Sequence, residues 1–83
     1  MYELRFSQEA INQLNRLEHS LAKRIMKKLG ETKENPHRHF KKLASSRESK
    51  LRIGDYRAIV LIFGKERVLL VSIIGHRKNI YKK

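Results

Sequence analysis

Two almost continuous apolar runs, at residues 56–63 and 67–74, restrict the possible folds of this chain more than any other feature. Each run has the length of one strand, and the turn-forming residues 64–66 separate them. Strands that are apolar on both sides are buried on both faces, so both runs predict central strands. Alternating apolar and basic residues at 49–53 predict a further strand just before them. This half of the chain therefore predicts a three-stranded antiparallel meander.

The N-terminal half has the patterns of a short strand and two helices. Residues 2–6 alternate apolar and polar, which predicts a strand with one buried face. Apolar residues then recur on one side of residues 8–18, and again from Leu21 to Leu29, as they do in amphipathic helices. Ser7 is the predicted N-cap of the first helix, and His19-Ser20 is the predicted connection between the helices.

The predicted architecture is α+β: a strand, a helical hairpin, then the meander, forming a small sheet with the helices packed on one face. Because Pro36 disfavours helix in the residue before it, the second helix should end earlier, and residues 36–49 are expected to form a basic loop. The 83 residues, 1–83, fit one domain with a modest core. No run approaches the roughly 20 apolar residues of a membrane span, and the N-terminus lacks a signal-peptide pattern. We therefore expect a cytoplasmic protein.

The charge balance predicts an anionic partner. Lys and Arg number 20 against 8 Asp and Glu, which gives a net charge of +12. The partner classes are nucleic acid, an acidic protein or an anionic membrane. A membrane fits least, because the apolar stripes of the helices are expected to lie in the core. The chain has no cysteine, which excludes disulfides, a thiol nucleophile and a Cys-ligated zinc site.

The hairpin predicted at Gly54-Asp55 creates an unfavourable pair of like charges. A two-residue type II′ turn at this position places Arg52 directly opposite Arg57. Opposed like charges destabilise a sheet by up to about 1 kcal/mol, and Lys50 adds a third cation on the same face. A phosphate held between these groups would offset the repulsion. The alternative is a solvated basic face whose side chains splay apart.

A second polar group, Gly75-His76-Arg77-Lys78-Asn79-Ile80-Tyr81, follows the last buried strand. Tyr81 can stack on a base, and His76 has the side chain that transfers protons most readily near neutral pH. The alternative is a frayed terminus with incidental charges. The acidic residues are scattered, so we expect no metal and no other cofactor. RNA can be cut without a metal, because its own 2′-OH attacks the adjacent phosphate when cations, an acid and a base are supplied.

The segments at residues 50–57 and 75–81 resemble those of the RelE branch of the RelE/ParE toxin superfamily, and the resemblance covers essentially the whole chain. It implies a RelE-like fold and the toxin of a type II toxin–antitoxin system. The implied enzyme is a ribosome-dependent, metal-independent endoribonuclease, or mRNA interferase, that cleaves mRNA in the ribosomal A site and inhibits translation. The implied partners are the ribosome, mRNA and a RelB-like antitoxin, with operator DNA bound only through the antitoxin complex and no membrane.

The resemblance also implies roles for individual residues. Lys50 matches a lysine that assists proton transfer, Arg57 an arginine that stabilises the transition-state phosphate, and Arg77 an arginine near the leaving group. Tyr81 matches a tyrosine that stacks on or orients the nucleotide. His76 stands where some relatives have lysine, and it either transfers a proton or binds phosphate. The further residues expected to bind RNA phosphates are Arg52, Lys41, Lys42, Arg47 and Lys78.

Two other functions remain open. A ParE-like protein shares the fold but poisons DNA gyrase without cutting RNA, and such toxins generally lack the combined arginine and tyrosine set present here. A non-catalytic RNA- or ribosome-binding module would use the same basic face for phosphate contacts alone. The chain also departs from some RelE members. Glu48 replaces a second lysine and the segment between Arg77 and Tyr81 is short, which leaves the acid and the base unassigned.

Overall fold

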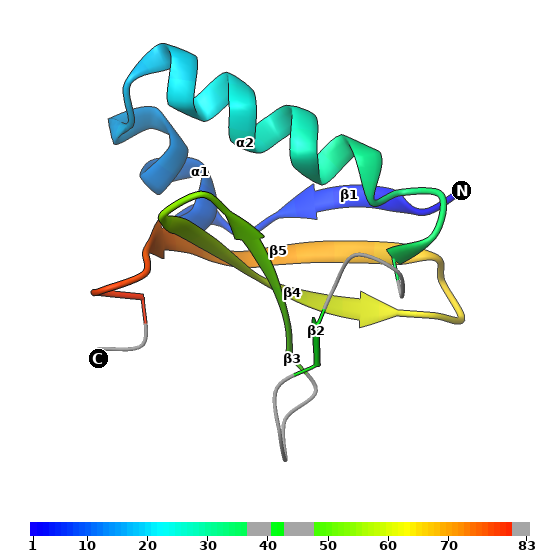
Figure 1. The fold of residues 1–83 in the computed structure, drawn as a ribbon. Helices are drawn as coiled ribbons and strands as arrows, with labels where there is room; N and C mark the ends of the chain where they lie inside the picture. The colour runs from blue at the N-terminus through cyan, green and yellow to red at the C-terminus, as the bar shows by residue number, and fades with distance from the viewer. Residues whose placement is uncertain (37–40, 43–47, 81–83) are drawn as a thin grey trace.

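The computed structural model describes residues 1–36, 41–42 and 48–80. These residues form a five-stranded sheet with helices covering one of its faces (Figure 1). In chain order the elements are β1 (Glu3–Phe6), α1 (Gln8–Arg16), α2 (His19–Glu31), β2 (Lys41–Lys42), β3 (Glu48–Ile53), β4 (Tyr56–Phe63) and β5 (Val68–His76). The predicted α+β class, with helices on one face, is therefore confirmed.

The sheet has the strand order β1-β5-β4-β3-β2. Strands β3, β4 and β5 form the predicted antiparallel meander. β1 pairs with β5 in parallel, with Glu3 opposite Val68 and Phe6 opposite Val71. A parallel pair needs a long crossover between its strands, and the segment between β1 and β5 includes both helices. β5 begins at Val68, because Arg67 adopts a left-handed conformation with φ of 56° in the preceding turn.

The short strand β2 corrects the prediction that residues 36–49 form only a loop. Its backbone pairs antiparallel with β3, with Lys41 opposite Lys50 and Lys42 opposite Ser49. Two adjacent lysines carry no apolar alternation, so the hydrophobic pattern gives no signal for such a strand. β2 places a basic segment along the outer edge of β3.

Ser7 is the N-cap of α1, as predicted. Its Oγ accepts a hydrogen bond from the backbone N–H of Ala10 at 3.0 Å, which satisfies one of the amides left unpaired at a helix start. The same hydroxyl donates to the carbonyl of Ser72 in β5 at 2.6 Å. One residue therefore ends β1, starts α1 and ties both to the middle of the sheet.

The predicted connection between the helices at His19-Ser20 is wrong. α1 ends at Arg16 and α2 begins at His19, so the connection lies at Leu17 and Glu18. Both connecting residues have extended backbones, with ψ of 154° and 141°. Leu17 packs against the core, and the hydroxyl of Ser20 donates to the Glu18 carboxylate at 2.7 Å. These tertiary and local contacts decide the boundary, and the apolar periodicity of the helices does not show them.

The core lies between the helices and the sheet face they cover. Ala10, Ile25 and Leu29 of the helices are fully buried there. The sheet contributes Leu51, Ile53, Ala58, Val60, Leu69, Val71 and Ile74. Since successive residues of a strand point to opposite faces, this packing leaves Lys50, Arg52 and Arg57 on the other, open face of the sheet. Among the described residues, no helix is long and apolar enough to span a membrane.

Candidate nucleic-acid interface

The β3–β4 hairpin has the predicted register. Arg52 lies directly opposite Arg57, and Ile53 lies opposite Tyr56. Gly54 has a φ of +59°, whereas Asp55 is not among the described residues with positive φ. A positive φ at only the first central position is the pattern of a type II′ turn. The turn therefore forces two arginines into a directly opposed pair on the open face.

The cations of the open face continue beyond this pair. Lys50 lies on the same face of β3 as Arg52, and the backbone of Lys41 pairs with that of Lys50 on the next strand. Lys50 and Arg57 are half-buried, and Arg52 is exposed. Within the described part of the chain, no carboxylate forms an ion pair with Lys50, Arg52 or Arg57. The cluster of Lys50, Arg52 and Arg57 therefore carries positive charge that an added anion would offset.

Arg57 is held by its own turn. Its Nη1 donates to the carbonyl of Gly54 at 3.2 Å and to the carbonyl of Tyr56 at 3.1 Å. Both acceptors are neutral carbonyls, so the positive charge of the guanidinium is not cancelled. The remaining N–H groups of the guanidinium stay available for two oxygens of an anion such as a phosphate.

The segment after β5 folds back onto the same hairpin. The backbone N–H of Arg77 donates to the carbonyl of Asp55 at 2.7 Å. The Nε of Arg77 lies 3.7 Å from Oδ1 of Asp55, in an exposed ion pair. Asn79 and Ile80 both donate backbone N–H groups to the carbonyl of His76, which closes a tight turn. Arg77 is therefore tethered to the turn that carries Arg57.

Ile80 fixes the end of this segment against the open face. It is only 6% exposed, and a Cβ at Gly75 would lie 3.6 Å from its own Cβ. Gly75 is the register partner of Arg57. The Ile80 side chain thus packs over the strand position beside the opposed arginines, and it brings the C-terminal turn to the edge of the basic cluster.

His76 lies on the other side of the sheet. Its register partner is Tyr56, which packs against the core, and the two rings meet edge to face with centroids 5.4 Å apart. The Nδ1 of His76 accepts a hydrogen bond from the backbone N–H of Lys78 at 3.2 Å. A nitrogen that accepts cannot carry a proton, so the neutral ring has its proton on Nε2. The structure does not bring His76 together with Lys50 and Arg57.

The remaining predicted residues have different positions. Lys78 is exposed in the turn after β5. Lys41 and Lys42 form β2, which runs beside β3. Arg47 and Tyr81 lie outside the described residues. Sequence reasoning missed Asp55 as the partner of Arg77 and Ile80 as the residue that packs on Gly75, because only the β4–β5 register brings these segments together.

The other end of the open face is apolar. A groove of about 290 Å³ is lined there by Phe63, Val68 and Leu70, with Arg5 and Glu66 at its rim, and Phe63 is 43% exposed. Glu3 accepts a hydrogen bond from Nε of Arg5 at 3.0 Å, and this bond and the neighbouring charge raise the pKa of Arg5 above its ordinary value. Arg5 is therefore paired, in contrast to the cations beside the β3–β4 turn.

Comparison with known proteins gives a family match and a set of similar folds. The family model of the ParE toxin of the type II toxin–antitoxin system parDE matches residues 4–81. No curated protein sequence matches the chain. A chain of the toxin–antitoxin complex RelBE2 from Mycobacterium tuberculosis has a TM-score of 0.84 and 23% identity, over 92% of this chain and 98% of that one.

Two further solved structures have a similar fold. The intact RelBE toxin–antitoxin complex of E. coli matches with a TM-score of 0.79 and 23% identity, over 92% of this chain and 96% of that one. The archaeal RelE–RelB complex from Pyrococcus horikoshii OT3 matches with a TM-score of 0.79 and 19% identity, over 94% and 97% of the two chains. At these identities the structures establish a common fold, and the predicted RelE-like fold is confirmed.

Proposed function

Because the chain belongs to the family of ParE toxins of type II toxin–antitoxin systems, within the RelE/ParE superfamily, we propose that it is a toxin that cleaves mRNA on the ribosome. The observation that carries this proposal is the opposed pair of Arg52 and Arg57, with Lys50 beside it and no carboxylate paired with these three among the described residues. A cluster that repels itself in the free protein is stabilised when it binds phosphate.

The proposed reaction is a metal-independent transesterification of RNA. The 2′-oxygen of one nucleotide attacks the adjacent phosphorus, and the bond from phosphorus to the 5′-oxygen of the next nucleotide breaks. The products are a 2′,3′-cyclic phosphate and a free 5′-hydroxyl, so one proton is removed from the nucleophile and one is delivered to the leaving oxygen. Fixed cations stabilise the extra charge of the pentacoordinate phosphorane.

The geometry supports distinct roles for the basic residues. Arg57, held by the two carbonyls of its turn, presents fixed donors to the transition-state phosphate. Lys50, half-buried on the same face, assists proton transfer. Arg77, tethered at Asp55, approaches from the C-terminal turn toward the leaving group. Tyr81 orients the nucleotide, and Arg52, Lys41, Lys42, Arg47 and Lys78 bind flanking phosphates.

His76 fits a positioning role better than the catalytic role expected from its residue type. Its Nδ1 is engaged by the amide of Lys78, and its ring packs on Tyr56, on the face away from Arg57. We propose that it shapes the turn that carries Arg77.

The proposed partners follow from the charge and shape of the open face. The ribosome and its mRNA supply the phosphates, so we expect the activity in the cytoplasm. A RelB-like antitoxin would neutralise the toxin, as the RelB–RelE complexes of similar fold indicate, and operator DNA would be bound only through that complex. The apolar groove at Phe63 lies on the same face as the cations but at its other end, which supports a long antitoxin segment with an acidic part and an apolar part.

Gyrase inhibition is the second candidate, because the matching family model is that of the ParE toxin. The basic cluster on the open face, which has no carboxylate partner among the described residues, favours the nuclease, since a protein that only blocks gyrase has no need of cations clustered to hold a phosphate. A supercoiling assay with purified gyrase separates the two functions.

The decisive experiment adds the purified protein to a translating extract and maps mRNA ends by primer extension, beside free mRNA and the Arg57→Ala, Arg77→Ala double variant. We expect cuts at ribosome-occupied codons only, and none with the variant. Unbroken mRNA with continued translation would rule out the nuclease, and gyrase inhibition by the same preparation would then identify the alternative.

A further inference from the structure

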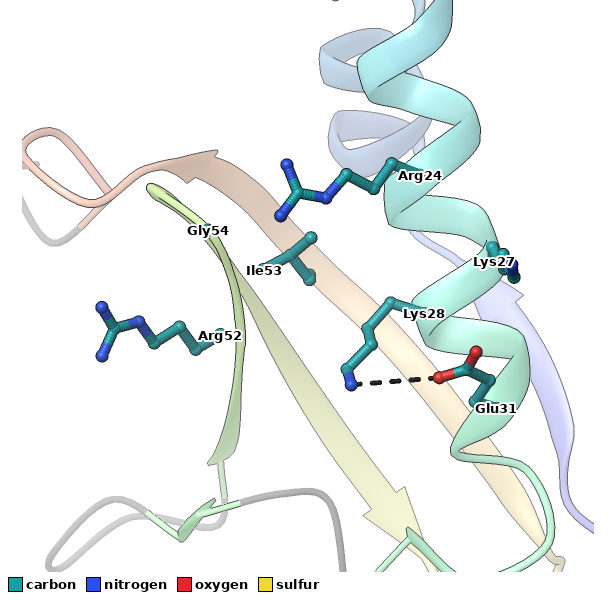
Figure 2. A pocket seen from close by; sticks show the side chains of 7 residues that line it. All are labelled: Arg24, Lys27, Lys28, Glu31, Arg52, Ile53 and Gly54. Carbon is teal, nitrogen blue, oxygen red and sulfur yellow. Dashed lines mark ion pairs between the residues drawn. The ribbon is translucent and has the colours of Figure 1, made fainter.

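A groove of about 370 Å³ lies on the helix side of the β3–β4 hairpin (Figure 2). α2 contributes Arg24, Lys27, Lys28 and Glu31 to its lining, and the hairpin contributes Arg52, Ile53 and Gly54. α2 covers the side of the sheet opposite to the open face (Figure 1), and Arg52 is the lining residue that the groove shares with the basic cluster of the open face. The roles proposed above use none of its helical residues.

Two pairs of like charges lie along α2. Lys23 and Lys27 are four residues apart, as are Arg24 and Lys28, and like charges at this spacing destabilise a helix. The one carboxylate in the lining is that of Glu31, which lies 3.9 Å from the ammonium of Lys28. Arg24 and Lys27 form no ion pair within the described residues. The groove therefore has an excess of positive charge that an anionic ligand would offset.

Arg24 places its guanidinium against the hairpin turn. A Cβ at Gly54 would lie 3.3 Å from Nη2 of Arg24, so this group rests beside the bare backbone of the turn. Figure 2 shows Arg24 and Lys28 extending from α2 toward the strand. Ile53, which is 4% exposed, gives the groove a firm apolar wall. The planar fork of an arginine held in this way suits a phosphate.

The hairpin tip carries cations on both of its sides. In Figure 2 the side chain of Arg52 points away from α2, whereas that of Arg24 reaches the tip from α2. Positive charge thus continues around Gly54 from the groove to the open face. A ligand with several charges spaced along one chain can contact both sides, and a single-stranded nucleic acid has this property.

We propose that the groove is a second phosphate-binding site, which holds a backbone phosphate of the RNA strand whose neighbouring phosphates bind the open face. This inference rests on the proposed function in one respect, the identity of the anion as RNA. The groove supplies affinity and direction to the strand, and it takes no part in bond cleavage.

The test compares two double variants of equal charge. Arg24→Gln with Lys28→Gln removes one arginine and one lysine from the groove, and Arg16→Gln with Lys65→Gln removes the same two types from exposed positions elsewhere. The probe is a fluorescent single-stranded 2′-O-methyl oligoribonucleotide, which cannot be cut because its 2′-oxygen is blocked. Its dissociation constant is measured over a range of salt concentrations, and the melting temperature of each variant is recorded.

We expect the Arg24→Gln, Lys28→Gln variant (the groove variant) to bind the oligonucleotide roughly tenfold more weakly at moderate salt than the Arg16→Gln, Lys65→Gln control. The logarithm of its binding constant should also fall less steeply with the logarithm of the salt concentration, by about 0.7 for each phosphate that it no longer binds. Its melting temperature should stay close to that of the wild type, because the variant removes both the like-charge pair of Arg24 and Lys28 and the ion pair of Lys28 with Glu31. Equal affinities and equal slopes for the two variants would overturn the proposal. A selective loss of poly-glutamate binding, with RNA binding intact, would overturn it as well and assign the groove to an acidic protein.

This experiment is independent of cleavage. If the primer-extension experiment finds no cuts but the groove variant still loses oligonucleotide affinity selectively, the second phosphate site stands and the nuclease proposal fails. If cuts are found and the two variants bind alike, the nuclease stands and the groove has no role in binding RNA.

Discussion

The Nδ1 of His76 accepts a hydrogen bond of 3.2 Å from the backbone amide of Lys78, across the turn that begins at Arg77. The imidazole thus acts as a fixed acceptor for a backbone group, while its ring packs edge to face on Tyr56. We therefore expect His76 to influence the shape of the turn, and through it the direction of the Arg77 side chain.

The first prediction separates positioning by His76 from proton transfer by its ring. The side-chain oxygen of asparagine can take the place of Nδ1, so His76→Asn should retain mRNA cleavage within roughly threefold, whereas His76→Ala should lose tenfold or more by misplacing Arg77. Primer extension in a translating extract gives both rates. If the ring instead donates a proton from Nε2, asparagine cannot replace it, and the cleavage rate of both variants falls about 10²–10⁴-fold.

The second prediction concerns Arg57. Arg57→Ala should lower the rate of mRNA cleavage by about 10²–10³-fold, because it removes preorganised donors from the developing phosphorane. Single-turnover cleavage on stalled ribosomes measures this effect without product release. Lys65→Ala, which removes one cation from an exposed position elsewhere, should cleave at the wild-type rate. A loss of similar size in both variants would show that general electrostatic attraction, and no specific contact, is responsible.

The third prediction uses the repulsion between the opposed arginines. Arg52→Ala should raise the free energy of unfolding by a few tenths to about 1 kcal/mol, since Arg52 faces Arg57 directly and forms no ion pair in the described part of the chain. Urea denaturation at low salt measures the gain, which should shrink in about 1 M salt as the charges are screened. A stability below that of the wild type at both salt concentrations would contradict an uncompensated pair.

The fourth prediction concerns the tether of Arg77. Asp55→Ala removes the exposed ion pair but keeps the backbone bond from Arg77 to the carbonyl of residue 55. Unfolding stability should therefore change by less than about 1 kcal/mol. Cleavage should fall several-fold at low salt, because the Arg77 side chain is less ordered. The difference between variant and wild type should diminish with added salt. A defect that is equal at all salt concentrations would point to a structural change in the turn.

The fifth prediction compares two glycines. Gly54 has a positive φ, which L-residues with a Cβ disfavour, so Gly54→Ala should destabilise the protein by about 1–2 kcal/mol. Gly30 lies within α2 with open space around its Cα, so Gly30→Ala should stabilise by about 0.5–1 kcal/mol. Thermal unfolding of the two variants checks the opposite signs. Destabilisation by both would mean that α2 near Gly30 is not an ordinary exposed helix.

Much of the fold could be predicted from the sequence, because hydrophobic periodicity is a local property. Alternation identified β1 and β3, and two apolar runs identified β4 and β5 as central strands. The predicted connection between the helices was wrong because its position depends on a contact that is not local. It depends on where Leu17 meets the core, which periodicity alone does not show.

In the candidate site, too, some residues are placed by local sequence and others only by tertiary packing. The sequence by itself determined that Arg52 opposes Arg57, because a two-residue turn at Gly54-Asp55 sets the register of its own hairpin. Lys50 follows from that register by simple alternation. These residues are close in the chain, so turn chemistry is enough to place them.

Only the tertiary structure decided which segments, far away in the chain, contact the β3–β4 hairpin. The β4–β5 register, with its irregularity at Ile59 and Val60, sets which face His76 takes and brings Arg77 to Asp55. Packing of α2 on the sheet brings Arg24 to Gly54 and creates the groove between them. Such contacts depend on the summed packing of segments far apart in the chain, and no local pattern in either segment encodes them.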